Sequence, residues 1–357
     1  MIHVTTDLIP ALSLVLHDVP HDRLFVLADE NTARYCLPMM EAMAEEYRLI
    51  TIGIGDEYKT LTTLATVWDA LEEGEATRHS LLMNVGGGVV TDLGGFAAAT
   101  FKRGIKYINV PTTLLAMVDA AVGGKTAINY HGLKNEIGAF CQPEHVIISP
   151  RFLATLDREN LLSGMAEMFK HILINEAAAS AAPNEYEALS DIFATFLHTP
   201  DEGALQAVAD AIAASIAVKE RIVTIDPTEQ GLRKALNFGH TMGHAIEELL
   251  LQQGHPVLHG YAVAWGMTGE LHLSHMKCGL SVDVLRQTTR QLRELYGPCP
   301  ITCKDYDALL SLMHHDKKNL SADAIRFALL SAPGHITLDC TASHEEIEEA
   351  LDFIREG

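Results

Sequence analysis

The sequence predicts an α/β fold, in which an N-terminal half built on a parallel sheet covered by helices precedes a mainly α-helical half. Three observations predict it. Short apolar runs alternate with amphipathic stretches up to about residue 150, a glycine-rich turn interrupts that alternation, and the later sequence changes to long patterns of Ala, Leu, Glu and His. The 357 residues also exceed the usual size of one domain. We therefore expect two domains, at residues 1–156 and 157–357.

Short apolar runs in the first half are bounded by polar residues or glycine, as buried parallel strands are. They are residues 23–29, 48–54, 80–85, 107–110 and 145–149. Between the second and third run, Leu61 to Glu73 carries apolar residues at helical spacing, which predicts an amphipathic helix beside the sheet. Residues 177–203 contain two prolines and a late glycine, so we expect a loop, a short helix and a turn without chemistry there.

Acidic residues outnumber basic ones by 47 to 26, which gives a formal net charge of −21. This charge repels nucleic acids and anionic membranes, so neither is expected as a partner. The sequence has no apolar run of membrane length, and its opening lacks a basic segment, so we expect a cytoplasmic protein without a signal peptide. The six cysteines are scattered and expected to stay reduced, and Cys299 and Cys303 lack the second pair typical of a zinc site.

A glycine-rich turn, Gly86 to Gly95, follows the third apolar run and leads into an Ala-rich stretch that we expect to be helical. Glycines let the backbone approach a pyrophosphate, and the N–H groups at a helix start favour an anion. The spacing is not the GxGxxG of a standard dinucleotide fold, so a tight turn without a ligand is the alternative. Asp29, at the end of the first run, either accepts from a ribose hydroxyl or caps a helix.

Basic residues gather near glycines between residues 100 and 140, notably Arg103, Lys125 and Lys134. In so acidic a chain, this clustering indicates a small anionic ligand that carries phosphate or carboxylate. Solvated surface charge is the alternative for each lysine taken alone.

Histidines cluster later in the chain. His240 and His244 lie four residues apart, which on a helix places both on one face at a spacing that can hold a divalent metal. His255 and His259 follow, and Glu167 is an acid within an apolar helical stretch that could complete a site. Spacing alone makes His240 and His244 the natural ligand pair, while buried histidines satisfied by the core are the alternative.

Six segments, in order along nearly the whole chain, carry a resemblance to a known family. They are GGGVVTDLGGFAAA, the stretch from PTTLLAMVDAAVGGK to GLKN, SGMAEMFK, EQGLRKALNFGHTMGHA, LHG and DKKN. Together they resemble the 3-dehydroquinate synthases, which are sugar phosphate cyclases of the shikimate pathway. The resemblance implies a Rossmann-like, NAD-binding domain at residues 1–156 and a helical metal- and substrate-binding domain at 157–357, with NAD and Zn²⁺ or Co²⁺ as cofactors.

The resemblance assigns the metal ligands to Glu167, His240 and His259, whereas His244 would contact the substrate phosphate or relay protons. It implies substrate or catalytic roles for Arg103, Asp119, Lys125, Asn135, Lys170, Lys219, Glu229, Arg233, Asn237 and one of Lys317 and Lys318. Cofactor contacts are expected at Asp29, Asp56, Lys59, Gly87, Gly88, Val89, Val90, Thr91, Asp92, Thr112, Thr113, Lys125, Lys134, Phe152, Leu153, Ala154 and Thr155. In the family, the residue matching Arg103 reaches the neighbouring subunit's site, which implies a homodimer.

The chain departs from the family pattern at four positions. Ala120 and Ala121 stand where serines are common, and Asp56 and Tyr261 each stand where Glu is usual. None of these changes removes an implied metal ligand.

The reaction implied by the resemblance converts 3-deoxy-D-arabino-heptulosonate 7-phosphate to 3-dehydroquinate and phosphate. It proceeds by transient oxidation with NAD, β-elimination, reduction and intramolecular aldol closure. The alternatives are another sugar phosphate cyclase, a metal-dependent polyol dehydrogenase of the same fold, and a catalytically silent binding protein. Arg233 with Lys134 favours a substrate with a carboxylate, and a dehydrogenase would not need so many cations around one small ligand.

Overall fold

The computed structural model describes residues 1–43, 45–131, 133–176, 182–315 and 325–356. The chain divides into two compact units, residues 1–157 with 192–216, and residues 158–191 with 217–357. The predicted domain limits, 1–156 and 157–357, stay a prediction, because compactness alone does not show that either part folds by itself.

A parallel sheet with the strand order β1-β8-β5-β4-β2-β3 forms the centre of the first unit. Its strands are β1 (Ile2–Val4), β2 (Leu24–Asp29), β3 (Tyr47–Ile52), β4 (Leu81–Gly86), β5 (Lys106–Pro111) and β8 (His145–Ile148). The five predicted strands are confirmed, and the three-residue edge strand β1 was missed because it is too short to show a pattern.

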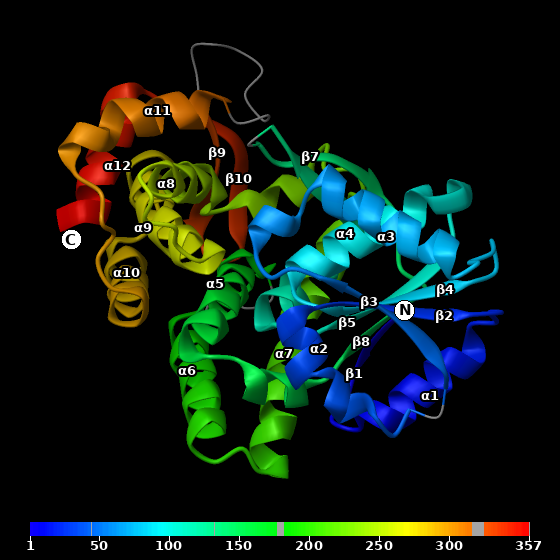
Figure 1. Cartoon of the computed structure of the whole chain (residues 1–357). Helices are drawn as coiled ribbons and strands as arrows, with labels where there is room; N and C mark the ends of the chain where they lie inside the picture. Colours follow the sequence, from blue (N-terminus) through cyan, green and yellow to red (C-terminus); the bar gives the residue numbers. More distant parts are fainter. Residues whose placement is uncertain (44, 132, 177–181, 316–324, 357) are drawn as a thin grey trace. The chain divides into compact units, whose positions relative to one another are not determined.

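Helices cover both faces of this sheet. They are α1 (Leu8–Asp18), α2 (Glu30–Tyr35), α3 (Leu61–Glu73) and α4 (Gly88–Thr100). Helices α3 and α4 lie on one face and α1 lies on the other (Figure 1). The predicted helix from Leu61 to Glu73 is confirmed as α3, which begins at the capping side chain of Thr60.

Helix α4 packs unusually close to the strands. A Cβ on Gly94 would lie 2.0 Å from Asn84 Oδ1, and one on Gly95 would lie 2.6 Å from the Thr126 side chain. Two glycines of the predicted turn therefore serve helix packing. Beside this sheet, β6 (Lys125–Tyr130) and β7 (Leu133–Phe140) form a separate antiparallel pair.

The second unit is mainly helical, as predicted. Its elements include α5 (Arg158–Ile174), α8 (His240–Gln252), α9 (His259–Cys278), α10 (Val282–Tyr296), α11 (Tyr306–His315), α12 (His344–Glu356) and the antiparallel pair β9 (Ile325–Ala332) and β10 (His335–Ala342). Helix α9 is buried on nearly all sides and packs against α5, α8, α10, α12 and β9. Gly266 makes this possible, because a Cβ there would lie 2.1 Å from the Gly239 carbonyl oxygen.

Two helices, α6 (Ala182–His198) and α7 (Glu202–Ile225), contribute residues to both units. The prediction of only a short helix within residues 177–203 was therefore wrong, since α6 has 17 residues. Pro183, one of the two prolines in this segment, does not prevent the helix, because proline is tolerated in the first turn, where its missing N–H has no intrahelical partner anyway. Among the described residues, no helix is both long and apolar enough to cross a membrane.

Candidate functional site

In the first unit, the predicted nucleotide residues lie where the strand order reverses. From β2 the chain proceeds to β3 at one edge, whereas from β4 it proceeds through β5 towards the other edge. The carboxyl ends of the adjacent strands β2 and β4 carry Asp29 and the Gly86 turn. Ligands of open parallel sheets bind at such a reversal point.

The start of α4 suits an anionic group. Gly87 occupies the N-cap position and supplies no capping side chain, and the first turn contains no acidic residue. A Cβ on Gly87 would lie 3.1 Å from Thr113, and one on Gly88 would lie 3.3 Å from Ala120, so side chains there would crowd the turn. Exposed first-turn N–H groups of this kind favour a phosphate.

Of the two roles predicted for Asp29, the structure shows helix capping. Its Oδ1 accepts from Thr32 N at 2.8 Å and caps α2. Capping uses only Oδ1, so Oδ2 could still accept from a ribose hydroxyl. That contact stays a prediction.

Five predicted site residues form a polar cluster. Lys59 Nζ lies 2.6 Å from Asp92 Oδ2 and also donates to Asn135, and it is buried. Asp56 Oδ2 lies 3.0 Å from Asn129 Nδ2 and 3.5 Å from Lys134 Nζ. The structure therefore joins residues from the helix α4, the segment after β3 and the β6–β7 pair. Buried Lys59 neutralises Asp92, so that carboxylate does not repel an incoming phosphate.

The remaining predicted cofactor residues differ in accessibility. The side chains of Val90, Phe152 and Leu153 are buried in the core, so any ligand contact of theirs must involve the backbone. Val89 and Thr113 are partly buried, Thr91 and Thr112 are buried, and Ala154 and Thr155 are exposed.

The predicted substrate residues of the first unit are accessible. Lys125 is exposed at the start of β6, Asp119 is partly buried, and Arg103 is exposed with a left-handed backbone, φ 70°. The predicted contacts at Lys317 and Lys318 lie outside the described residues.

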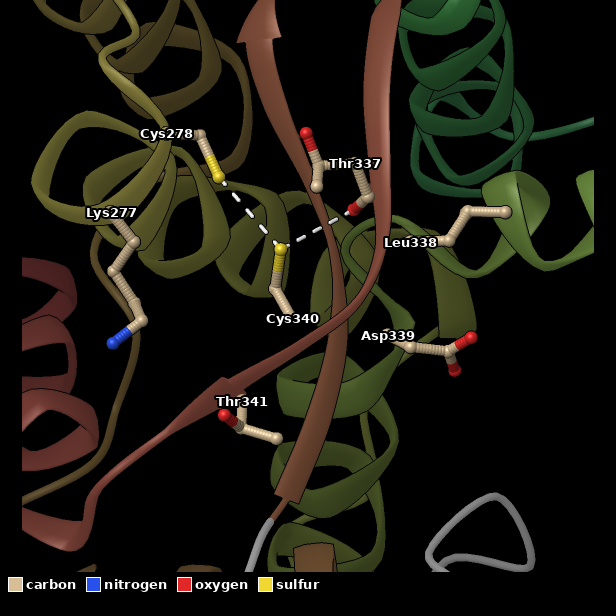
Figure 2. A pocket seen from close by; sticks show the side chains of 7 residues that line it. All are labelled: Lys277, Cys278, Thr337, Leu338, Asp339, Cys340 and Thr341. Atoms are coloured by element: carbon tan, nitrogen blue, oxygen red, sulfur yellow. Dashed lines mark hydrogen bonds between the residues drawn. The ribbon is translucent and has the colours of Figure 1, made fainter.

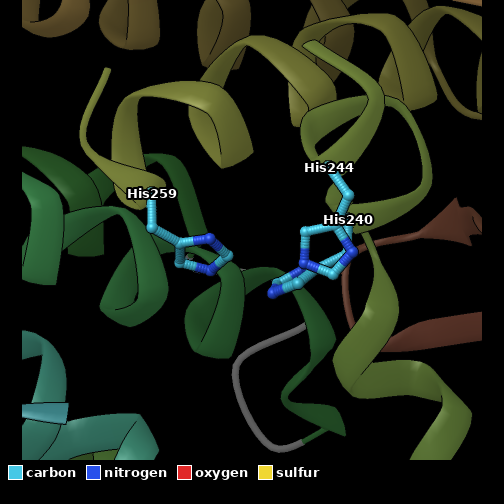
Figure 3. Close-up of side chains that lie close together, drawn as sticks. All are labelled: His240, His244 and His259. Atoms are coloured by element: carbon cyan, nitrogen blue, oxygen red, sulfur yellow. The ribbon is translucent and has the colours of Figure 1, made fainter. Parts of the chain in front are cut away.

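The second unit gathers three histidines. His240 begins α8, His244 lies one turn later, and His259 begins α9; their side chains point toward one another (Figure 3). One ring nitrogen of each lies within 4.8 Å of the others. The prediction that His240 and His244 share one face of a helix is confirmed. Packing brings His259, which the resemblance implied as a ligand, close to both rings.

Glu167 of α5 faces two of these rings. Its Oε1 lies 3.3 Å from His240 Nε2 and 3.7 Å from His259 Nε2. Two ligand atoms bound at about 2.0–2.1 Å to one tetrahedral ion are about 3.3–3.4 Å apart, so the first distance fits a shared metal. Both Glu167 oxygens are completely buried and make no well-aligned hydrogen bond to any residue that the structure describes.

The tautomer of His240 strengthens this fit. Its Nδ1 lies 3.2 Å from the Phe238 carbonyl oxygen, which can only accept, so Nδ1 carries the proton. Burial and the nearby Lys170 lower the pKa of His240, although Glu167 opposes them, so the ring is neutral near pH 7. The Nε2 lone pair then faces a carboxylate oxygen, and a metal cation between the two atoms would make that approach favourable.

Lys170 supplies a further charge. It is buried and forms an ion pair with Glu167 Oε2, one turn away on α5. Burial raises the pKa of Glu167, but Lys170 and His240 outweigh it and hold that pKa well below its usual value. Glu167 is therefore an ionised carboxylate at neutral pH.

Sequence reasoning missed Glu247, which holds the ring of His259. Its Oε2 lies 3.0 Å from His259 Nδ1 and leaves Nε2 directed at Glu167. Metal-bound histidines commonly have such a carboxylate on the other nitrogen. A signal was present in the sequence, because Glu247 follows His240 by seven residues and so lies on the same face of α8.

Of the other predicted residues of the second unit, Lys219 lies on α7 and the rest lie within residues 226–237. Glu229 Oε1 accepts from Asn237 Nδ2 at 2.7 Å, and Arg233 is buried, as is Lys219. Asp226, also missed, accepts from the backbone N–H groups of Gln230, Gly231 and Arg233 at 2.7–3.1 Å. Although burial raises it, these N–H groups lower the pKa of Asp226, so this loop is held by an ionised side chain.

A surface pocket of about 530 Å³ lies elsewhere in this unit, between the end of α9 and β10 (Figure 2). No predicted site residue lines it. Cys278 and Cys340 face each other there with 3.8 Å between their sulfur atoms. Burial and Cys278 raise the pKa of Cys340 to about 11, which makes it a poor nucleophile.

Binding of a divalent metal is expected to release a proton. Burial lowers the pKa of His259, but Glu247 and Glu167 outweigh it and raise that pKa to about 10. Without metal the ring is therefore protonated at pH 7, whereas a metal ligand must be neutral. The apparent affinity should fall about tenfold for each unit that the pH drops below that pKa.

Calorimetric titration of Zn²⁺ in two buffers with different ionisation enthalpies measures this proton. Glu247→Gln is the matched variant, since it should reduce the number released at pH 7. Equal heats in both buffers for the wild-type protein would contradict the prediction.

Comparison with known proteins is consistent with this geometry. A family profile described as "3-dehydroquinate synthase N-terminal" matches residues 49–163, and one described as "3-dehydroquinate synthase C-terminal" matches residues 164–319. A 3-dehydroquinate synthase of Parabacteroides distasonis is 46% identical over 99% of this chain and 97% of its own length. One from Clostridium tetani is 34% identical over 93% of this chain and 86% of its own length.

Solved structures share the fold. The 2-epi-5-epi-valiolone synthase of Streptomyces hygroscopicus, with NAD⁺ and Zn²⁺ bound, is 26% identical with a TM-score of 0.84, and the match covers 98% of this chain and 95% of that one. A 2-deoxy-scyllo-inosose synthase complexed with carbaglucose-6-phosphate, NAD⁺ and Co²⁺ is 24% identical with a TM-score of 0.81, covering 100% and 96%. The second likeness concerns the fold alone.

Proposed function

This chain belongs to the 3-dehydroquinate synthase family, and we propose that it converts 3-deoxy-D-arabino-heptulosonate 7-phosphate to 3-dehydroquinate and phosphate, using NAD and a divalent metal. The metal is Zn²⁺ or Co²⁺ in this proposal. The main observation in support is that the Glu167 carboxylate lies close to the rings of both His240 and His259. In each ring a hydrogen bond at Nδ1 leaves Nε2 directed at that carboxylate.

Glu167, His240 and His259 would hold the metal, and the turn at Gly87 and Gly88 with Asp92 would hold NAD. When bound, NAD supplies a transient hydride acceptor and the divalent ion supplies a Lewis acid that acidifies a substrate hydroxyl. Three protein ligands leave a position open for that hydroxyl, as in other catalytic sites.

His244 has a different role in this proposal. It is exposed, whereas His240 is buried, so it is accessible to a substrate in a way that its neighbour is not. We assign to it contact with the substrate phosphate or proton relay. Transfer of a proton by a positioned histidine contributes about 10²–10⁴-fold to a rate.

Cations orient the anionic groups of the substrate in this proposal. Lys170, Lys219 and Arg233 are three buried cations of the second unit, and cations of this kind attract phosphate and carboxylate groups. Their combination suits a small ligand with both a phosphate and a carboxylate. The hydrogen bond between Glu229 and Asn237 fixes the orientation of the Asn237 amide.

The proposal extends to location and assembly. We place the protein in the cytoplasm as a homodimer, in which exposed Arg103 reaches the neighbouring site. The location rests on the sequence, which lacks an apolar run of membrane length and a basic opening segment, and the homodimer rests on the family resemblance.

Phosphate release tests the function. The purified protein, supplied with NAD and Zn²⁺ or Co²⁺, should release one phosphate per heptulosonate phosphate consumed, with no net change in nicotinamide absorbance. Steady accumulation of NADH would identify a polyol dehydrogenase instead. Phosphate release from sedoheptulose 7-phosphate, but not from the heptulosonate, would identify another cyclase.

A further inference from the structure

A buried carboxylate outside the predicted ligand set holds the helix that carries His240. Glu270 of α9 is fully buried, and its Oε2 accepts from the backbone N–H of Gly239 at 2.7 Å. Its Oε1 accepts from the N–H groups of Thr241 at 3.1 Å and Met242 at 3.3 Å. Both oxygens of one side chain therefore bind the first turn of α8.

This contact satisfies a need that α8 cannot meet by itself. The first N–H groups of a helix lack intrahelical partners, and a Ser, Thr, Asp or Asn at the N-cap usually accepts from them. The N-cap of α8 is Gly239, which has no side chain and a left-handed φ of 80°. A Cβ there would lie 2.4 Å from Met267, so no capping residue fits.

The three N–H groups surround the metal-ligand position. Gly239 and Thr241 are the immediate neighbours of His240 in the chain, and both are bound by Glu270. The same helix α9 that carries Glu270 begins with His259. One side chain thus ties the backbone at one proposed ligand to the helix that supplies another.

We propose that Glu270 is a positioning residue for the metal site, acting as an N-cap supplied by a neighbouring helix. The proposal rests on the proposed function, since it concerns the same metal. Glu270 sets the distance between His240 Nε2 and Glu167 Oε1 through the backbone of residues 239–242. Its negative charge also suits the positive end of the α8 dipole.

Glu270→Gln tests this with little change of volume. The amide keeps one acceptor but presents an NH₂ group to an N–H donor, so at least one contact with the first turn is lost. The affinity for Zn²⁺, measured by competition with a chelating dye, should fall about 10–100-fold, as for other groups that orient ligands. The visible spectrum of the Co²⁺-loaded variant should also change, because the ligand geometry has changed.

Glu248→Gln is the matched control, since Glu248 lies on α8 itself but accepts only a surface hydrogen bond from Gln252 Nε2, at 2.9 Å, among the bonds that the structure describes. It should leave both the affinity and the Co²⁺ spectrum as in the wild type. Wild-type affinity and an unchanged Co²⁺ spectrum in Glu270→Gln would overturn the proposal. A wild-type protein that binds no metal would instead refute the proposed function.

Hydrogen exchange in the wild-type protein provides a test that does not depend on a variant folding. The amides of Gly239, Thr241 and Met242 should exchange slowly even without metal, because Glu270 binds all three. Rapid exchange of these amides under native conditions would overturn the inference.

Discussion

Replacing His259 by alanine is expected to lower the affinity for Zn²⁺ at least about a thousandfold, because three protein ligands share a binding free energy on the order of ten kcal/mol. Turnover should be lost with the metal. Replacing His244 by alanine is expected to leave metal content near that of the wild type, while turnover falls about 10²–10⁴-fold. Metal analysis after dialysis, combined with the phosphate-release assay, separates the two results.

His255 supplies the control, since it is exposed on the segment between α8 and α9, only four residues before His259. His255→Ala should change neither metal content nor turnover. If His244→Ala lost the metal and His259→Ala kept it, the ligand pair would be His240 and His244, the reading that helical spacing alone favours. That exchange of roles would contradict the proposed ligand set.

Replacing Lys170 by methionine is expected to destabilise the metal-free protein by about 3 kcal/mol, because removal of one partner of a buried ion pair leaves Glu167 with only the more distant imidazolium of His259 beside it. Both partners, Lys170 and Glu167, are essentially without solvent contact. The loss should be smaller with Zn²⁺ bound, since the ion then compensates Glu167. Thermal unfolding with and without metal measures both effects, and turnover should fall at least about a hundredfold.

Lys277→Met is the matched control, because Lys277 pairs with Glu346 at 2.6 Å at the surface. The Lys277 and Glu346 side chains are 26% and 30% exposed. Ion pairs at the surface contribute about 1 kcal/mol or less to the free energy of unfolding. Equal stability of Lys170→Met and wild type without metal would show that Glu167 does not depend on the ammonium. The charge of Glu167 would then be compensated by protonated His259 alone, contrary to the prediction.

Much of the first unit could be predicted from the sequence. The five predicted strands and helix α3 are present, because continuous apolar runs and helical spacing are local properties of a segment. The glycine-rich turn was recognised for the same reason. The β6–β7 pair was not predicted, since β7 is exposed along most of its length and shows no buried pattern.

In the second unit, the sequence by itself determined that His240 and His244 share one face of a helix, and its motifs resembled the family. The resemblance implied Glu167, His240 and His259 as one ligand set. Only the tertiary structure shows the distances between them, the contact of Glu247 with His259, and the binding of Glu270 to the start of α8. The physical reason is the range of the forces. Spacing along one helix follows from its 3.6-residue period, whereas a contact between helices depends on which glycines let their backbones approach.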